Sequence, residues 1–339
     1  MWCHLRLPSR LACAVLASAA CSERPPASRA AADTTARAGA DVPVSHAAYA
    51  LTPDSVRLWY RVVGRGRETV LVGAANYFAN SLDSLVTAER RVVYYDLRGR
   101  GRTDSVPPTK MGIVEFDAED IDVIRQSVGA ETVTLVGWSG GVLAAFRYAL
   151  RHPDRVSRLV MITPVGPRWV PYWDDMRRRA AARIDTAERR RLAERVQRGE
   201  FAGNEAALCR AQARIGLRTN WPDSTQWLRA PDVCDSPNEL PSRYDDFVPR
   251  LLKKLGQYDW RSDLARMPVP TLVMHGALDV TPLEGSREWV AGMPKARLYV
   301  MQGVGHWPHY ERPEETLRVL RTFLAGGWPA ESEPSPDAP

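Results

Sequence analysis

Residues 132–153 read TVTLVGWSGGVLAAFRYALRHP, and this stretch decides the fold. It opens with apolar residues that favour a strand and closes with an alanine-rich segment that favours a helix ending before Pro153. Between them stands Ser139, in the pattern G-x-S-x-G. On a tight strand-to-helix turn, small neighbours allow a strained backbone that lifts the serine hydroxyl clear of the sheet. We therefore predict that Ser139 is a nucleophile, beside the free N–H of Gly140 at the helix N-terminus.

The sequence around this stretch alternates between short apolar segments and helical ones. Strands are predicted at 55–63, 69–73, 91–96, 132–137, 156–163, 271–276 and 297–303, and helices at 79–89, 116–128, 140–152, 284–291 and 313–325. Such alternation is typical of an α/β protein with a mostly parallel sheet and helices on both faces. The pattern breaks at residues 165–262, where we expect a helical cap inserted into a core formed by 46–164 and 263–325.

A serine hydroxyl is a poor nucleophile unless a base and an orienting acid accompany it. Asp279 lies just past one predicted strand, and His306 lies just past the next. Because the carboxyl ends of parallel strands meet at one edge of a sheet, we expect Ser139, Asp279 and His306 to meet there. His309 is the main alternative base, but His306 directly follows a glycine-rich turn that can present it. Glu284 is the one other carboxylate near Asp279.

Four stretches together resemble the α/β-hydrolase superfamily: the G-x-S-x-G segment, YYDLRGRGRTD (94–104), PTLVMHGALDVTPLEGSREW (270–289) and GVGHWPHYERPEE (303–315). The resemblance covers residues 50–325 and is greatest with the proline iminopeptidase and esterase-like branch. It implies the α/β-hydrolase fold with an inserted cap, and hydrolysis through an acyl-enzyme. Ser139 would attack a carbonyl, His306 would take its proton, and Asp279 would hold the imidazole.

One departure from the superfamily concerns the oxyanion hole. Many members carry His-Gly after the third strand, whereas residues 72–76 of this chain read VGAAN. The donor is a backbone group, so we predict that the N–H of Ala75 joins that of Gly140, with Ala74 as the alternative. The missing His-Gly also motivates another hypothesis, a catalytically inactive hydrolase fold that serves as a binding module.

The substrate class stays open between an ester and a small peptide amide. An iminopeptidase would need carboxylates in or near the cap to hold an amine, and Glu200, Glu205 and Glu239 are candidates. A purely apolar pocket would favour esters. A further alternative keeps the triad but changes the reaction, to that of a cofactor-free haloperoxidase or a C–C hydrolase.

Composition narrows the possible partners. The formal net charge of +6 comes mostly from arginine, which recurs throughout the chain. The sequence contains no zinc-spaced Cys/His cluster, phosphate-binding G-x-x-x-x-G-K or RNA-binding aromatic motif. We therefore expect a small-molecule substrate, no nucleic acid, no metal and no cofactor. The oligomeric state is not determined by the sequence.

The N-terminus has the pattern of an export signal. Arg6 and Arg10 precede the short apolar run LACAVLASAA, which ends at Cys21. Residues 1–21 also resemble a bacterial lipoprotein signal, in which the cysteine is lipidated and attaches the protein to the membrane. Ser18 departs from that pattern, and Ala17–Ala19 offer ordinary cleavage and a secreted product instead. The expected location is the periplasm or a membrane-anchored lipoprotein.

Two further segments and two cysteines complete the predictions. Residues 22–45 and 326–339 are poor in large apolar side chains, so we expect a disordered tether and a flexible tail. Cys209 and Cys234 are the two cysteines outside the signal region. They form either a disulfide, as export would allow, or two buried thiols.

Overall fold

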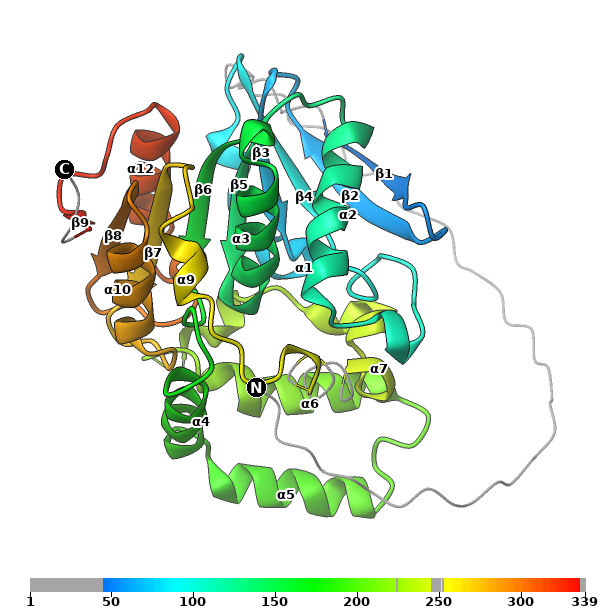
Figure 1. Ribbon diagram of the computed structural model, residues 1–339. Coiled ribbons are helices and arrows are strands. Elements are labelled where there is room, and N and C mark those ends of the chain that lie inside the picture. Colours follow the sequence, from blue (N-terminus) through cyan, green and yellow to red (C-terminus); the bar gives the residue numbers. More distant parts are fainter. Residues whose placement is uncertain (1–44, 224, 245–250, 252, 336–339) are drawn as a thin grey trace, which may run out of the picture.

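The computed structural model describes residues 45–335 except 224, 245–250 and 252. Its nine described strands form one sheet in the order β1-β2-β4-β3-β5-β6-β7-β8-β9 (Figure 1). The strands are β1 (Ser45–Leu51), β2 (Arg57–Val63), β3 (Glu68–Gly73), β4 (Arg90–Tyr95), β5 (Val133–Trp138), β6 (Val156–Ile162), β7 (Thr271–Gly276), β8 (Ala296–Met301) and β9 (Glu333–Pro334). The six central strands are parallel, and β1, β2 and β9 are antiparallel at the edges.

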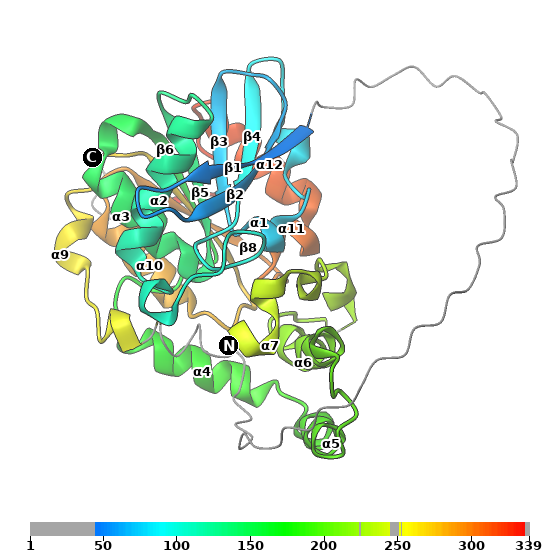
Figure 2. The same cartoon turned by 90° about the vertical axis from the view of Figure 1, so that its right-hand side faces the viewer.

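Helices cover both faces of this sheet, as the sequence predicted. One face carries α2 (Val114–Ser127), α3 (Val142–Arg151), α9 (Arg261–Leu264) and α10 (Leu283–Gly292). The other carries α1 (Ala75–Phe78) and α12 (Pro313–Leu324), as Figure 1 and Figure 2 show. Successive strand residues point to opposite faces, so Leu135 belongs to the first core and Val136 to the second. Burial on both faces explains why these strands are continuously apolar.

Between β6 and β7 the chain leaves the sheet and forms α4 (Tyr172–Ala182), α5 (Thr186–Gln197), α6 (Glu205–Arg218) and α7 (Pro241–Tyr244). Figure 2 shows these helices at one end of the sheet, with α5 standing furthest from it. A buried cluster joins this segment to the core, and it includes Trp221 of the segment and Trp307 of the core. The short helix α11 (Pro308–Glu311) follows Trp307.

The prediction of a flexible tail from 326 to 339 is wrong for the described residues 326–335. Glu333–Pro334 pair with β8, and the Trp328 ring packs on Phe323 with its centroid 5.1 Å away. The guanidinium group of Arg297 lies over the Trp328 ring, 5.3 Å from its centroid. The packing of Trp328, together with the pairing to β8, thus holds this largely polar segment against the core.

Two other elements differ from prediction. The chain pairs in β1 from Ser45 onward, although no strand was expected there. The helix predicted at 79–89 is replaced by α1 and a 3-10 turn at Asp83–Leu85. In that region Tyr94 donates its hydroxyl to Asp83 and accepts the N–H of Leu82, so side chains from β4 fix the loop.

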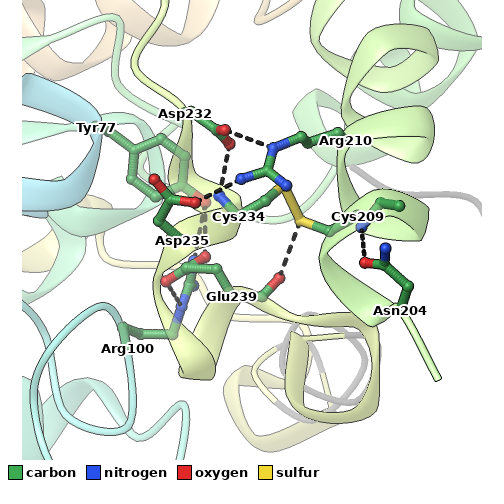
Figure 3. The surroundings of a disulfide bond; sticks show 10 residues. Tyr77, Arg100, Asn204, Cys209, Arg210, Asp232, Cys234, Asp235 and Glu239 are labelled. Atoms are coloured by element: carbon green, nitrogen blue, oxygen red, sulfur yellow. Dashed lines mark hydrogen bonds and ion pairs between the residues drawn. A yellow bond between two sulfur atoms is a disulfide. The ribbon is translucent and has the colours of Figure 1, made fainter. Parts of the chain in front are cut away.

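The structure resolves the question about the two cysteines, because Cys209 of α6 and Cys234 form a disulfide (Figure 3). Both are buried. Arg210, next to Cys209, pairs with Asp232 and Asp235 on either side of Cys234. The disulfide thus joins α6 to the 3-10 turn that precedes Glu239.

Replacing both cysteines with alanine should lower the stability of the protein. The bond closes a separation of 25 residues, and the loss of such a closure destabilises by about 3 kcal/mol on the chain-entropy model. Thermal unfolding of the Cys209→Ala, Cys234→Ala variant should show a lower Tm than the wild type. Dithiothreitol should lower the Tm of the wild type and leave that of the variant unchanged. Equal Tm values under oxidising conditions would contradict the prediction.

The predicted export signal at 1–21, its Cys21 and the tether to residue 44 lie outside the described residues. Within the part of the chain that the structure describes, no helix is both long enough and apolar enough to cross a membrane.

Candidate active site

Ser139 occupies a strained turn between β5 and α3. Its φ is 53°, in the left-handed region that few non-glycine residues adopt. A Cβ at Gly137 would lie 2.9 Å from the Cα of Val142, so only glycine lets the helix approach the strand this closely. At Gly141 a Cβ would meet nothing within 4 Å. Close packing therefore requires glycine at position 137, two residues before the serine, but not at position 141, two residues after it.

Asp279 and His306 are joined by hydrogen bonds in the loops after β7 and β8. The Nδ1 of His306 lies 3.0 and 2.9 Å from the two carboxylate oxygens of Asp279. The N–H of Thr281 also donates to Asp279, at 2.8 Å. Burial alone would raise the pKa of Asp279, but the charge and hydrogen bond of His306 lower it below its usual value. The carboxylate therefore stays ionised beside the ring.

Ser139 and His306 line the same cavity, which has a volume of about 200 Å³. Among the described residues no hydrogen bond joins the Ser139 hydroxyl to the His306 ring. Such bonds are often long in unliganded hydrolases and shorten with substrate. The predicted serine and base thus line one cavity, and the predicted acid is hydrogen-bonded to the base.

Three hydrogen bonds to the main chain of His306 hold its loop in place. The His306 carbonyl accepts the indole N–H of Trp138 at 2.9 Å and the hydroxyl of Thr163 at 3.2 Å. The His306 N–H donates to the carbonyl of Asn220 in the segment between β6 and β7, at 3.0 Å. A Cβ at Gly305 would lie 2.5 Å from that same carbonyl oxygen. Gly305 is therefore fixed by close packing, not by a need for a flexible turn.

Glu311 is a positioning residue that the sequence reasoning missed. Its carboxylate accepts the N–H of Gly305 at 2.8 Å and that of Trp307 at 2.9 Å, and so braces both sides of His306. Burial raises its pKa, and the two backbone hydrogen bonds oppose that shift. The sequence gives one indication of this role, which is that Glu311 lies on the short helix α11 shortly after the histidine.

The alternative histidine, His309, lies outside the cavity wall. Its ring stacks on Phe78 with the centroids 4.3 Å apart, and burial lowers its pKa to about 3. His275 is also buried, with its two ring nitrogens 2.8 Å from the Ser286 hydroxyl and 3.0 Å from the Thr281 carbonyl. Burial lowers its pKa as well. Both rings are therefore neutral and buried, and neither lines the cavity.

The two candidate oxyanion donors after β3 are placed differently. Ala74 lines the cavity together with Gly140, whereas Ala75 is buried and is not part of the cavity wall. Ala74 has a φ of 61°, the left-handed conformation that glycine would adopt more readily. Asp96 accepts the N–H of Asn76 at 2.9 Å and so fixes this turn. The wall position favours Ala74 over the predicted Ala75, although both N–H groups belong to the same turn.

None of the three glutamates considered for binding an amine lines the cavity. Glu239 is buried and forms a two-point ion pair with Arg100, at 2.9 and 2.6 Å (Figure 3). Glu200 pairs with Arg195 at the surface, and Glu205 accepts the hydroxyl of Ser242. The interior of the cavity is therefore free of these carboxylates.

The cavity wall is mostly apolar, with two ionisable residues from the core. Of the described lining residues other than His306, only Arg100 and Asp117 carry side chains that ionise near neutral pH or are permanently charged. Burial and Asp120 raise the pKa of Asp117 to about 8, Glu115 adds to this, and Arg98 and Arg100 oppose it. Asp117 is consequently protonated at pH 7.

Because Asp117 keeps its proton in the folded state, it should make the stability depend on pH. Its pKa rises from 3.8 in the unfolded chain to about 8, so the folded state binds more protons between those pH values and stability falls as pH rises through them. The Asp117→Asn variant should be more stable than the wild type at pH 7, by roughly a few kcal/mol. The two should converge near pH 4.

Urea unfolding of both proteins between pH 4 and pH 8 measures this difference. Glu119→Gln is the matched control, because Glu119 lies on the same helix but is exposed, where it pairs with Arg151. A stability difference between Asp117→Asn and the wild type that is constant across the range would show that Asp117 does not carry the proton.

Comparison with known proteins identifies the class. The model of the alpha/beta hydrolase fold family matches residues 71–313. The chain therefore belongs to the α/β-hydrolase family, and its sheet with helices on both faces is the fold of that family.

Individual relatives differ in activity. A 2-hydroxy-6-oxononadienedioate/2-hydroxy-6-oxononatrienedioate hydrolase of Pseudomonas putida is 26% identical over 282 residues, which cover 79% of this chain and 92% of that protein. A proline iminopeptidase of Heyndrickxia coagulans is 23% identical, covering 74% and 87%. Among solved structures, an esterase from Exiguobacterium antarcticum has a TM-score of 0.60 at 19% identity, covering 82% and 98%. The chain is thus similar in sequence to a 2-hydroxy-6-oxo acid hydrolase and to a proline iminopeptidase, and it shares its fold with an esterase.

Proposed function

We propose that this chain is an exported serine hydrolase that cleaves small esters through an acyl-enzyme on Ser139, His306 and Asp279. The observation that carries the proposal is the Asp279–His306 hydrogen-bonded pair, which opens into the cavity that Ser139 also lines. Membership of the hydrolase family supports the same conclusion.

In the proposed mechanism the Ser139 hydroxyl attacks the substrate carbonyl while His306 takes its proton. Asp279 accepts a hydrogen bond from Nδ1–H, which leaves Nε2 as the basic nitrogen and stabilises the cation that forms. The N–H of Gly140 and one from the Ala74–Ala75 turn bind the developing oxyanion. The proton then passes from His306 to the leaving alcohol, and water repeats the sequence to release the acid.

An ester is favoured over a peptide amide by the wall of the cavity. An aminopeptidase holds the substrate's free amine with carboxylates, and the glutamates that could do so lie elsewhere or are paired with arginine. The remaining lining is dominated by apolar side chains, among them Leu97, Trp173 and Leu217. Such a surface binds acyl chains through burial of apolar area.

C–C bond hydrolysis on the same triad is the second candidate function. It is favoured by the curated relatives that hydrolyse 2-hydroxy-6-oxo acids, which match over most of this chain. A C–C hydrolase and an esterase share the same nucleophile and differ in the leaving group, which is carbon in one and oxygen in the other.

A substrate panel separates these functions. Purified protein is assayed with p-nitrophenyl butyrate, L-prolyl p-nitroanilide and a 2-hydroxy-6-oxo dienoic acid, before and after treatment with a fluorophosphonate. Ester turnover that fluorophosphonate abolishes supports the proposal. Preferential cleavage of the prolyl amide or of the dienoic acid would assign the chain to those activities instead. A folded protein that neither turns over nor labels would support the inactive binding module.

We propose in addition that residues 1–21 direct export and that Cys21 is lipidated. The disulfide supports an oxidising compartment, where such bonds persist. Expression of the full chain in a bacterium, followed by fractionation, tests this: the wild type should remain with membranes and Cys21→Ala should be released. Equal membrane association of both, or a secreted product that begins at Ala20, would overturn lipidation.

A further inference from the structure

One carboxyl group in the cavity wall, that of Asp117, has no hydrogen-bond partner among the described residues. Asp117 is 7% exposed and lines the cavity. Among the described residues its carboxyl makes neither a hydrogen bond nor an ion pair. Buried carboxyl groups are otherwise nearly always satisfied, because an unmade hydrogen bond costs about 1–3 kcal/mol.

The neighbouring residues on α2 show how unusual this is. Asp120 forms a two-point ion pair with Arg98, and Asp122 accepts hydrogen bonds from Arg125 and Tyr148. Asp117 comes from the first turn of the same helix, where a carboxylate usually faces water. Here it is buried and forms part of the cavity wall.

The charges around Asp117 restrict what can bind there. Arg100 lines the same wall and disfavours a second cation, while Glu239, buried against Arg100, disfavours an anion. A protonated carboxyl at this place has an O–H to donate and a carbonyl oxygen to accept with. A neutral oxygen of the substrate fits these conditions, and the side chains of Leu97 and Val114 beside it would surround it with apolar contacts.

We propose that Asp117 is a specificity-determining residue that hydrogen-bonds a neutral oxygen, such as a ketone carbonyl, in the chain of the ester substrate. The preferred substrates are then oxo-esters, in which a second oxygen lies several carbons from the scissile carbonyl. The inference rests on the proposed function, and the raised pKa of Asp117 agrees with it because the proton to be donated is present at pH 7.

Matched ester pairs test the proposal. The p-nitrophenyl esters of 4-oxopentanoic, 5-oxohexanoic and 6-oxoheptanoic acid are each compared with the straight-chain ester of the same length. The wild type should prefer at least one oxo-ester by about tenfold in kcat/KM, the factor expected of one hydrogen bond to a buried donor. Asp117→Leu should remove the preference, and Asp117→Asn should keep part of it, because the amide N–H still donates.

Two comparisons make the result decisive. Glu119→Gln, on the same helix but exposed, should keep the wild-type preference. The p-nitrophenyl ester of 6-aminohexanoic acid probes for a cation. An amine preference that both Asp117→Asn and Asp117→Leu abolish would overturn the proposal in favour of an ammonium site. An oxo preference that survives in Asp117→Leu, or no oxo preference in the wild type, would overturn it as well.

Binding to Ser139→Ala separates this proposal from the function on which it rests. Calorimetry with the intact oxo- and straight-chain esters should show tighter binding of the oxo-ester in Ser139→Ala, and equal binding in the Ser139→Ala, Asp117→Leu double variant. If the wild type hydrolyses no ester but this binding difference is found, the proposed function fails and the specificity site stands. If esters are hydrolysed but the two esters bind equally well, the proposed function stands and the specificity proposal fails.

Discussion

Ser139→Ala should reduce ester turnover by about 10⁴-fold or more and abolish covalent labelling by a fluorophosphonate. The loss follows because the hydroxyl is the group that bonds to the substrate carbon, and no other side chain can replace it. The oxyanion donors and the cavity remain, so weak residual catalysis over water is expected. Labelling followed by intact mass spectrometry and the rate with p-nitrophenyl butyrate measure the two effects.

Ser157→Ala is the matched control for this variant. Ser157 lies on β6 and its hydroxyl donates to the carbonyl of Val133, away from the cavity. It should label and turn over like the wild type. Full turnover in Ser139→Ala would contradict the assignment of the nucleophile and with it the proposed mechanism.

Asp279→Asn should lower kcat by about 10³- to 10⁴-fold while leaving the fold intact. The amide can donate its N–H to Nδ1 of His306, which places the ring proton on Nε2 and removes the base from the Ser139 side. The negative charge that stabilises the imidazolium is lost at the same time. Stopped-flow acylation by p-nitrophenyl butyrate isolates the step that should slow.

Asp263→Asn is the matched control for this variant. Asp263 lies on α9 and pairs with Arg147 at 3.0 Å, outside the cavity. Its neutralisation should leave kcat near the wild-type value. If Asp279→Asn were equally active, the base would have to be oriented by another group, and the hydrogen bond to His306 would be structural.

The sequence was sufficient to predict the central strands because burial on both faces leaves them uniformly apolar. It was insufficient at the edges. β1 is rich in alanine and largely exposed, so its composition does not favour a strand. The two residues of β9 are too few to show any periodicity. Both strands form because they pair with a neighbouring strand, and this pairing cannot be recognised from the local sequence.

The site shows a similar division. The positions of Ser139, Asp279 and His306 follow from motif and strand order, so they could be inferred before the structure. Asp117 could not, because an aspartate in the first turn of a helix normally faces water and stabilises the helix dipole. Glu311 acts through backbone N–H groups, which leave no trace in residue identity. Contacts of this kind become visible only once the loops are placed in three dimensions.

The close approach of the Asn220 carbonyl to Gly305 has a consequence for which substitutions the core accepts. The glycine before the base is imposed by the inserted segment, since a Cβ there would collide with that segment's main chain. Core and insertion are therefore sterically coupled at this one point: a larger residue at position 305 would push apart the inserted segment and the loop that carries His306. A single added carbon in the core would in this way disturb how the insertion covers the cavity.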